Sequence, residues 1–529
     1  MAKAVCFSLC QFLRYCCRLL AEFGQILRPD AHNLANKLRI LDMKLLNWLF
    51  ALLCWSANAN AQQTFYVATN GVDVANGGTL AAPWASITFA LDRVPDASVI
   101  LVRPGTYTGR VRIRGQFNQG VSVRSEVPYQ ARLRAPEAVL TIYNDNANIE
   151  GITIEGFDIA HTGAGAAALV IQIQDGFATE TRRITLRDNI LHDSFNNDIL
   201  KINNGASQIR VIGNIFYNQT GSDEHIDVNS VDDVIIEDNV FFNCFSCSGR
   251  TNANDTASFV VVKDSNAGDD EYLGARNVLI RRNVMLNWEG SVGSGFILFG
   301  EDGTANFEAF DSVAENNLLL GNSGNTQRSP LGVKGSRDIV FRHNTVVGNL
   351  PANAFATRIN REGDNPPIEA VRFAHNIFAD ASGTMQDFSD ILPADLSVAR
   401  PSVLVRNAYF NGANALPNDP ADALNISNDA QRVEGNPQLP LQTSLTNLSL
   451  PFWLPNQSQF NGGFARIRDV FVELVESYGR PAAGSVVFGA ATVAADIPST
   501  DILGNARSVQ DADLGALQRV DAGFRNGFE

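Results

Sequence analysis

The segments IRVIGNIFYN, residues 209–218, and VIIEDNVFFN, residues 234–243, carry the pattern that decides the fold. In each, apolar residues alternate with polar ones up to an Asn, and a second apolar run follows. The pattern recurs between Arg187 and Gly412, where its key asparagines are Asn189, Asn214, Asn239, Asn283, Asn317, Asn344, Asn376 and Asn407. Successive asparagines are 25, 25, 44, 34, 27, 32 and 31 residues apart. Repeats at such periods indicate stacked units that share one core.

The repeating unit is built of strands, because Val, Ile and Phe alternate at period two and no copy is long enough for a helix. Three short strands in a turn of about 25 residues predict one coil of a parallel β-helix, with the key Asn at the bend between the second and third strands. Its amide can then bond to the equivalent Asn of the neighbouring coils. We therefore interpret these asparagines as structural.

The N-terminal region carries an export signal that begins at Met43. Lys44 is followed by an apolar run from Leu45 to Trp55 and by the small residues Ala59-Asn60-Ala61. This pattern is typical of a cleaved signal peptide, and the run is too short to span a membrane. We expect residues 1–42 to be an upstream extension or a mis-called start, residues 43–61 to be the signal peptide, and the protein to be secreted, periplasmic or on the cell surface.

The net charge and the cysteine content restrict the binding partners and the kinds of cysteine site that the protein can have. Residues 1–61 hold seven of the 41 Lys and Arg and three of the 56 Asp and Glu, so their removal changes the formal charge from −15 to −19. This sign argues against a nucleic-acid partner. Only Cys244 and Cys247 lie outside the leader, and in an exported protein their spacing favours a local disulfide. A structural zinc site would need a second cysteine pair.

The first segment after the leader, residues 64–109, contains a strand, an Asn/Gly loop, a short helix near residues 86–93 and the turn Pro104-Gly105-Thr106-Tyr107. Together with the repeats it resembles the pectate-lyase-like superfamily of right-handed β-helices. The resemblance implies an all-β fold, a single right-handed parallel β-helix over residues 62–412, with a helix that caps the first coil. It says little about activity, because that superfamily includes lyases, hydrolases, epimerases and proteins without activity.

The remaining part, residues 413–529, begins with irregular Pro/Asn/Asp-rich loops. A helical face follows, made of Phe464, Ile467, Val470, Phe471, Leu474, Val475 and Tyr478, and Gly479 ends it. We expect this helix to cap the far end of the β-helix. The segment from Asp501 to Gln518 resembles the closing segment of secreted β-helix proteins, and the last six residues are interpreted as a sorting tag.

The first strand of each coil shows which side chains face outward, because every second residue is apolar. One outward column is Gln174, Asn203, Asn229, Lys263, Gly300, Lys334 and Asn360. Its neighbour is Gln172, Lys201, Asp227, Val261, Leu298, Gly332 and Arg358. A third column begins Val170, Ile199, His225, Phe259 and Phe296. We expect Phe259 and Phe296 to form an aromatic floor for a sugar ring, with Asn203, Asn229 and Asn360 as further substrate-binding residues.

A row of cations next to such a floor suits β-elimination on a uronic acid, which needs a neutralised carboxylate and a base. The prediction assigns Lys263 or Lys201 as the base, with a pKa lowered by neighbouring cations. Lys334 and Arg358 would neutralise the carboxylate, and His225 is an alternative proton carrier. Asp223, Glu224 and Asp227 offer oxygen ligands for Ca²⁺. Lys201 and Asp227 are equally consistent with a simple ion pair between coils.

The sequence also departs from the enzymes that it resembles. The chondroitinase-B and alginate-lyase group typically carries Glu-x-Glu with Lys-Ser and an Arg-His-Gly, whereas the corresponding strand here reads HIDVNS. The His and Asp motifs of polygalacturonases and mannuronan epimerases are also missing. His343 and His375 directly precede key asparagines, so we interpret them as structural.

Two functions remain open. The first is a polysaccharide lyase that acts, as a monomer, on an acidic glycan, or a glycoside hydrolase whose paired carboxylates would be Asp227 and Glu301. The second is an extracellular β-helix that binds glycan without cleaving it, such as an adhesin. We favour the lyase.

Overall fold

The computed structural model describes residues 62–266, 272–321, 324–350, 352–440, 450–508 and 510–519. The predicted upstream extension, signal peptide and sorting tag lie outside these residues. The chain from Gln63 onward forms one compact unit. None of the helices in the described ranges has the length and hydrophobicity needed to cross a lipid bilayer.

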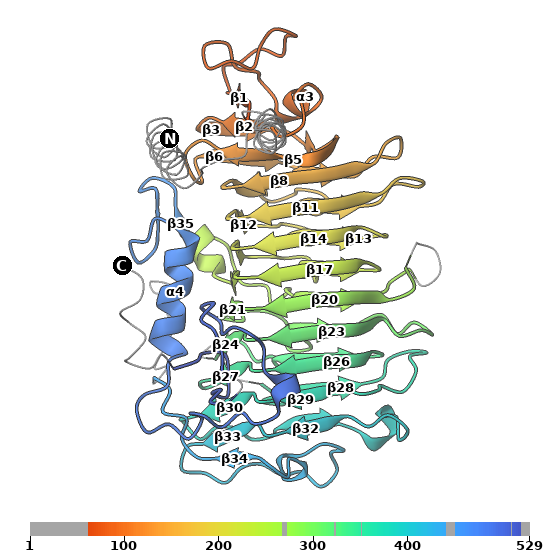
Figure 1. Ribbon diagram of the computed structural model, residues 1–529, viewed down its shortest axis with the longest axis vertical. Helices are drawn as coiled ribbons and strands as arrows, with labels where there is room; N and C mark the ends of the chain where they lie inside the picture. Colours follow the sequence, from red (N-terminus) through yellow and green to blue (C-terminus); the bar gives the residue numbers. More distant parts are fainter. Residues whose placement is uncertain are drawn as a thin grey trace, which may run out of the picture. The chain divides into compact units, whose positions relative to one another are not determined.

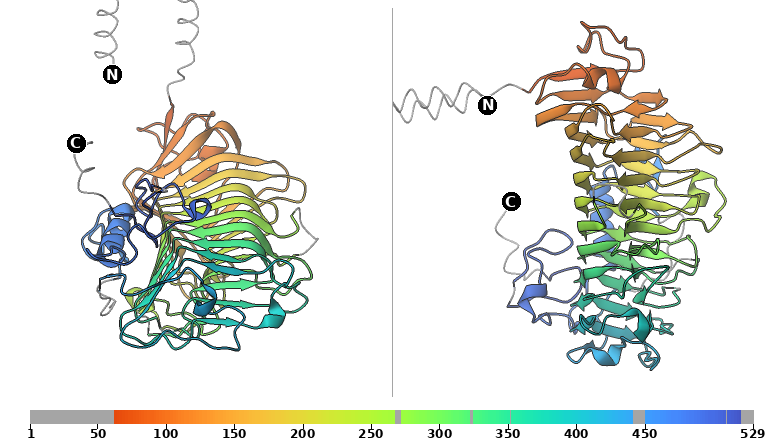
Figure 2. Two further views of the ribbon diagram at one scale, coloured as in Figure 1. Left: turned by 60° about the horizontal axis from the view of Figure 1, so that its bottom comes forward. Right: turned by 90° about the vertical axis from the view of Figure 1, so that its right-hand side faces the viewer.

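The unit is a right-handed parallel β-helix, as predicted, whose coils stack along one axis (Figures 1 and 2). Three parallel sheets run the length of the stack, and each coil contributes one strand to each sheet. In chain order a coil passes through sheet C, then sheet A, then sheet B. Apolar side chains of all three sheets fill the space between them as one continuous core.

Sheet A contains the middle strand of each coil. Its members are β1 (Thr64–Val67), β2 (Val99–Val102), β5 (Gln116–Ser125), β8 (Ile149–Glu155), β11 (Thr181–Arg187), β14 (Ser207–Ile212), β17 (Asp232–Glu237), β20 (Ala275–Arg281), β23 (Ala309–Glu315), β26 (Arg337–Arg342), β29 (Arg372–Ala374) and β32 (Val403–Val405).

Sheet B contains the last strand of each coil. Its members are β3 (Gly105–Thr108), β6 (Ala131–Ala135), β9 (Asp158–His161), β12 (Ile190–His192), β15 (Ile215–Tyr217), β18 (Val240–Phe242), β21 (Val284–Met285), β24 (Leu318–Leu320), β27 (Thr345–Val347), β30 (Ile377–Asp380), β33 (Ala408–Asn411) and β34 (Val433–Glu434).

Sheet C contains the first strand of each coil and carries the predicted site. Its members are β4 (Val111–Arg112), β7 (Leu140–Ile142), β10 (Ile171–Gln174), β13 (Leu200–Asn203), β16 (Glu224–Asn229), β19 (Ser258–Lys263), β22 (Gly295–Phe299), β25 (Leu331–Lys334), β28 (Thr357–Asn360) and β31 (Ser389–Ile391).

The key asparagines form the predicted ladder at the bend between sheets A and B. Asn214 donates from its backbone N and from Nδ2 to Oδ1 of Asn239, at 2.8 and 3.1 Å, and the same pair of bonds repeats from Asn189 to Asn407. The residue before each ladder asparagine has a φ between 52° and 69°, which turns the chain sharply. These residues are Asp188, Gly213, Asp238, Arg282, Asn316, His343, His375 and Arg406.

The ladder ends on a carboxylate. Asn407 donates from its backbone N and from Nδ2 to Asp429 Oδ2, and Tyr409 donates its hydroxyl to the same oxygen. This arrangement lets β34 pair with β33, so the parallel stacking continues past the predicted boundary at residue 412. The boundary was placed too early because Asp429 takes the position of a ladder residue without matching the repeat.

Within the described residues, two α-helices flank the β-helix. The first, α3 (Ile87–Leu91), packs Ile87, Ala90 and Leu91 into the core beside the first strands. The second, α4 (Ile467–Tyr478), begins and ends close to the predicted residues.

The predicted position of α4 is wrong. It does not close the far end but lies along the outer face of sheet B, beside β21 (Figure 1). Sheet B presents outward apolar residues such as Ile215, Val284 and Leu318, and Phe471 and Leu474 of α4 cover them. Large apolar patches are rarely left exposed to solvent, which explains why α4 packs on this face.

Short elements complete the chain. They are η1 (Phe245–Ser248), η2 (Pro393–Asp395), η3 (Ile426–Asn428), η4 (Ala494–Asp496) and the antiparallel pair β35 (Trp453–Leu454) and β36 (Gln459–Phe460). Cys244 and Cys247 are joined by a disulfide at η1.

Candidate functional site

The register of sheet C matches two of the predicted outward columns. Lys201 pairs with Asp227, Asn229 pairs with Lys263, and Gly332 pairs with Arg358. The columns nevertheless separate into two centres. Lys201 and Lys263 lie on β13 and β19, whereas Lys334 and Arg358 lie on β25 and β28.

The first centre, which we call the lysine–carboxylate cluster, consists of Asp198, Lys201, Asp223, Glu224, Asp227, Lys263 and Glu301. Lys201 Nζ lies 2.5 Å from Asp227 Oδ2 and 3.8 Å from Asp198 Oδ2. Lys263 Nζ lies 2.5 Å from Glu301 Oε2 and 3.7 Å from Asp227 Oδ2. Asp227 is therefore shared by both lysines.

The electrostatics of the lysines are the reverse of the prediction. Burial alone would lower the pKa of Lys263, but the charges of Asp227, Glu224 and Glu301 together raise it well above its usual value. Asp227 and Asp198 likewise outweigh burial and raise the pKa of Lys201. The expectation of a lowered lysine pKa was wrong because it counted the neighbouring cations and missed the acids.

Three carboxylates of the cluster converge. One oxygen from each of Asp198, Asp223 and Glu224 lies within 4.8 Å of the others. Burial, with the charge of Asp227 next, raises the pKa of Asp198 to about 7, and burial also raises the pKa of Glu224 and Asp223. Asp198 is 1% exposed and its Oδ2 accepts no hydrogen bond among the described residues.

This group differs by one residue from the predicted metal ligands, Asp223, Glu224 and Asp227, which remain a prediction. Asp198 joins the first two, while Asp227 lies beside them and contacts the two lysines. Carboxylate oxygens are the ligands that Ca²⁺ prefers. Asp198 lies just before β13, in a corner that the strand columns did not include.

Glu308 fixes the loop that brings Glu301 to Lys263. Its buried carboxylate accepts bonds from the backbone N of Glu301, Asp302 and Gly303 at 2.6, 2.9 and 2.7 Å. Asn365 Nδ2 donates to the same carboxylate at 2.8 Å. The loop is therefore held to two coils at once.

The third predicted column does not face outward. Phe259 and Phe296 are fully buried and stack with each other at 5.3 Å, so they form no floor for a sugar. His225 is also fully buried, stacks on Phe259 and hydrogen-bonds Asn243. Burial lowers the pKa of His225 to about 3, which leaves it neutral and out of reach as a proton carrier.

The two predicted asparagines nearest the cluster are also poorly accessible. Asn203 is 7% exposed and Asn229 is 2% exposed. Asn229 Oδ1 accepts bonds from the Ser230 hydroxyl and from the Ser265 backbone N, so it braces a corner. Asn360 is more exposed and lies at the second centre.

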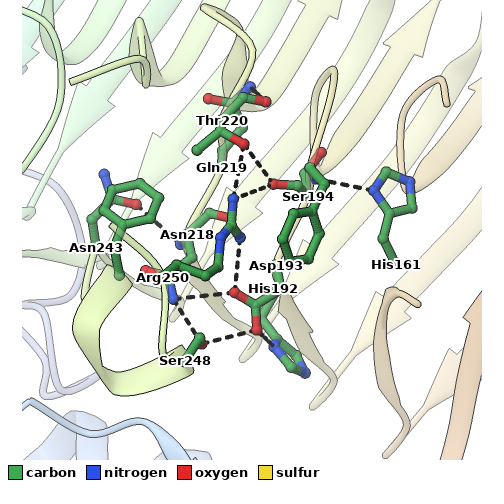
Figure 3. A network of polar contacts seen from close by, with 12 residues as sticks. His161, His192, Asp193, Ser194, Asn218, Gln219, Thr220, Asn243, Ser248 and Arg250 are labelled. Carbon is green, nitrogen blue, oxygen red and sulfur yellow. Dashed lines mark hydrogen bonds and ion pairs between the residues drawn. The ribbon is translucent and has the colours of Figure 1, made fainter. Parts of the chain in front are cut away.

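A polar network braces the corner between sheets B and C close to the cluster (Figure 3). At its centre Arg250 donates to Asp193 Oδ1, to the Ser194 carbonyl and to the Thr220 hydroxyl, at 2.9, 2.9 and 2.8 Å. The Ser248 hydroxyl, next to the disulfide, donates to Asp193 as well. These bonds join the corners of three coils and so support β13, β16 and β19.

The second centre, which we call the arginine pocket, is a shallow depression between β22 and β28 that is open to solvent. Its charged and polar lining residues include Arg328, Lys334, Arg358 and Asn360, and Leu298 and Gly332 contribute to its floor. Arg328 and Arg358 both contact Asp390, Arg358 at 3.4 Å, and Lys334 Nζ lies 2.6 Å from Glu362. Arg328 was not singled out in the sequence because it lies before β25.

Comparisons with known proteins give likenesses in fold only. No protein-family model matches the chain, and no curated protein matches it. Among solved structures, pectate lyase Pel9A matches with a TM-score of 0.48 and 14% identity, covering 88% of this chain and 98% of its own. XylC in complex with xylose matches with a TM-score of 0.49 and 10% identity, covering 87% and 98%. The A-module of mannuronan C-5 epimerase AlgE4 from Azotobacter vinelandii matches with a TM-score of 0.36 and 14% identity, covering 62% and 91%.

Proposed function

We propose that the protein is an exported polysaccharide lyase that cleaves a uronic-acid-containing glycan by β-elimination at the lysine–carboxylate cluster. One observation carries the proposal: the partly exposed Lys201 and the largely buried Lys263 lie beside a group of crowded carboxylates with raised pKa values on sheet C, the sheet that also carries a cation-lined pocket. Such perturbed groups gather at functional sites.

In the reaction a base removes the C5 proton of the uronate. The electron pair forms a double bond between C4 and C5, the bond from C4 to the glycosidic oxygen breaks, and that oxygen takes up a proton. Lys263 is the proposed base; its Nζ lies on the outward column, 3.7 Å from Asp227 Oδ2 and 2.5 Å from Glu301 Oε2. Lys201, whose side chain is 23% exposed, is the proposed partner of the substrate carboxylate.

Lys263 can serve as a base only if the surrounding negative charge is reduced. We propose that Asp198, Asp223 and Glu224, with Asp227 beside them, hold Ca²⁺ through their oxygens. A bound cation would stabilise the charge that develops on the substrate carboxylate. Once these carboxylates are neutralised, the field that raises the pKa of Lys263 weakens, and its ammonium group can lose a proton.

A glycoside hydrolase is the second candidate, because the raised pKa of Asp198, about 7, also suits a general acid. The products separate the two reactions. We would incubate residues 62–529 with pectate, alginate and chondroitin, with Ca²⁺ or with chelator, and record ultraviolet absorbance and reducing ends. A lyase yields both signals, whereas a hydrolase yields reducing ends alone. Neither signal on any polymer would contradict both enzymes and leave a glycan-binding protein.

A further inference from the structure

The arginine pocket is a separate binding site rather than part of the reacting centre. Lys263 lies on β19 and Arg358 on β28, and sheet C places three coil steps between these strands. At about 4.8 Å for each step the two residues are about 14 Å apart along the axis. One uronate carboxylate cannot contact both, so if Lys263 is the base, Arg358 would meet the carboxylate of a different sugar.

The pocket is built to receive an anion. Three cations line it, and among the described residues only two carboxylates contact them. Asp390 contacts both arginines, and Glu362 contacts Lys334. Arg358 Nε lies 3.4 Å from Asp390 Oδ2, and Arg328 contacts the same carboxylate, so one aspartate holds both guanidinium groups. Two guanidinium groups placed together match the oxygens of a carboxylate or a sulfate ester.

The floor of the pocket suits a sugar ring. Gly332 has no side chain, and a Cβ placed there would come within 2.7 Å of Leu298 Cδ1. The floor is therefore shallow and apolar, while the cations stand at its side. An acidic sugar presents an apolar ring face and a charged group at its edge, which is the same division of polarity.

We infer that the arginine pocket is a distal subsite that binds the anionic group of a sugar about three residues along the glycan from the sugar that reacts. The inference rests on the proposed function for the reacting sugar only. A sugar in an extended glycan is about as long as one coil is thick, so a chain lying along the axis passes one sugar over each strand of sheet C. The protein would then select polymers with repeated negative charges over single acidic sugars.

The test is isothermal titration calorimetry with oligouronates of three and of six residues, in a Lys263→Gln background so that turnover does not consume the ligand. Arg358→Ala is compared with Arg210→Ala, a matched control on sheet A. Both side chains are 29% exposed and each contacts one aspartate. We expect the hexamer to bind about tenfold or more weakly to the Arg358→Ala protein. The trimer should bind both proteins equally.

Several outcomes would overturn the subsite. They are an unchanged hexamer affinity, an equal loss for trimer and hexamer, equal binding of an uncharged hexamer, and no binding of any polyanion to the parent. A sulfated oligosaccharide of the same length distinguishes a sulfate from a carboxylate site. If binding depends on Arg358 but the wild-type protein forms no unsaturated product, the subsite stands and the lyase proposal falls.

Discussion

The lysine–carboxylate cluster and the arginine pocket lie on the same face of sheet C, yet their charges are balanced in opposite ways. In the cluster, acids outnumber the two lysines, and Asp198, Glu224 and Asp227 are almost completely buried. In the pocket, cations outnumber the carboxylates that contact them and the side chains are more exposed. A crowded buried site changes pKa values, whereas an open one mainly provides attraction. We therefore expect chemistry at the first and affinity at the second.

The largest difference between the two regions should appear in the rate of cleavage. Lys263→Ala should lower kcat by about a hundredfold to ten-thousandfold, because it removes the base. Arg358→Ala should raise KM on long substrates and leave kcat nearly unchanged. Both are measured from the absorbance of the unsaturated product. Equal losses of kcat in the two variants would contradict the assignment of catalysis to the cluster and of substrate binding to the pocket.

The two regions should also differ, by a smaller amount, in how they affect the dependence of activity on Ca²⁺. Asp198→Asn removes one of the three crowded carboxylates, and we expect the Ca²⁺ concentration for half-maximal activity to rise about tenfold or more. Asp390→Asn in the arginine pocket should leave this concentration unchanged. Calcium titrations of both variants check the prediction, and a wild-type rate that is insensitive to chelator would contradict it.

Disturbing the loop held by Glu308 should lower the rate of cleavage by less than the loss of Lys263 does. Glu308→Gln keeps the size of the side chain but weakens the bonds to three successive backbone N–H groups, so Glu301 would shift against Lys263. We expect kcat to fall about threefold to tenfold and its pH dependence to move, with hexamer affinity retained. A loss of affinity with an unmoved pH profile would indicate general damage to the fold.

The smallest effect concerns stability. The pKa of Asp198 is raised by folding from 3.8 to about 7, so the folded state favours its protonated form. This contribution is fully present below pH 3.8 and is lost as pH rises through about 7. Without added cation, Tm should fall by about 1–3 °C between about pH 5 and about pH 8 because of this group.

The Asp198→Asn protein provides the control, since its amide stays neutral and should flatten this part of the curve. Adding Ca²⁺ to the wild-type protein should flatten it too. A Tm that rises over the same pH range in the wild-type protein alone would contradict the raised pKa.

The sequence predicted the ladder and the two outer columns because period-two alternation determines which side chains face outward. The prediction of outward-facing side chains was wrong at the residues where the strands of sheet C begin. Val170 and Ile171 are both fully buried, since the chain turns inward at that corner, and His225 and Phe259 share the position of Val170. The largely apolar composition of that column was the available warning.

The sequence analysis missed Asp198 and misjudged the surroundings of the lysines for different reasons. Asp198 precedes Glu224 by 26 residues, the same offset as between Lys201 and Asp227, so its alignment could have been found from the strand columns. The position of Glu301 could not, because it depends on Glu308 and on a coil further along. Contacts set by loops between distant coils leave no periodic signal.

The ladder and its last residue show what deamidation of an asparagine would do to the stack. Each asparagine accepts bonds from the residue before it and donates its own amide to the one after, so the row has a direction. Asp429 accepts and donates nothing onward, which is tolerated because no further ladder residue follows. Deamidation of an inner asparagine would create the same terminus in mid-stack, with a carboxylate facing the carbonyl of the next amide. The stack therefore depends on burial to protect these amides from hydrolysis over the lifetime of the protein.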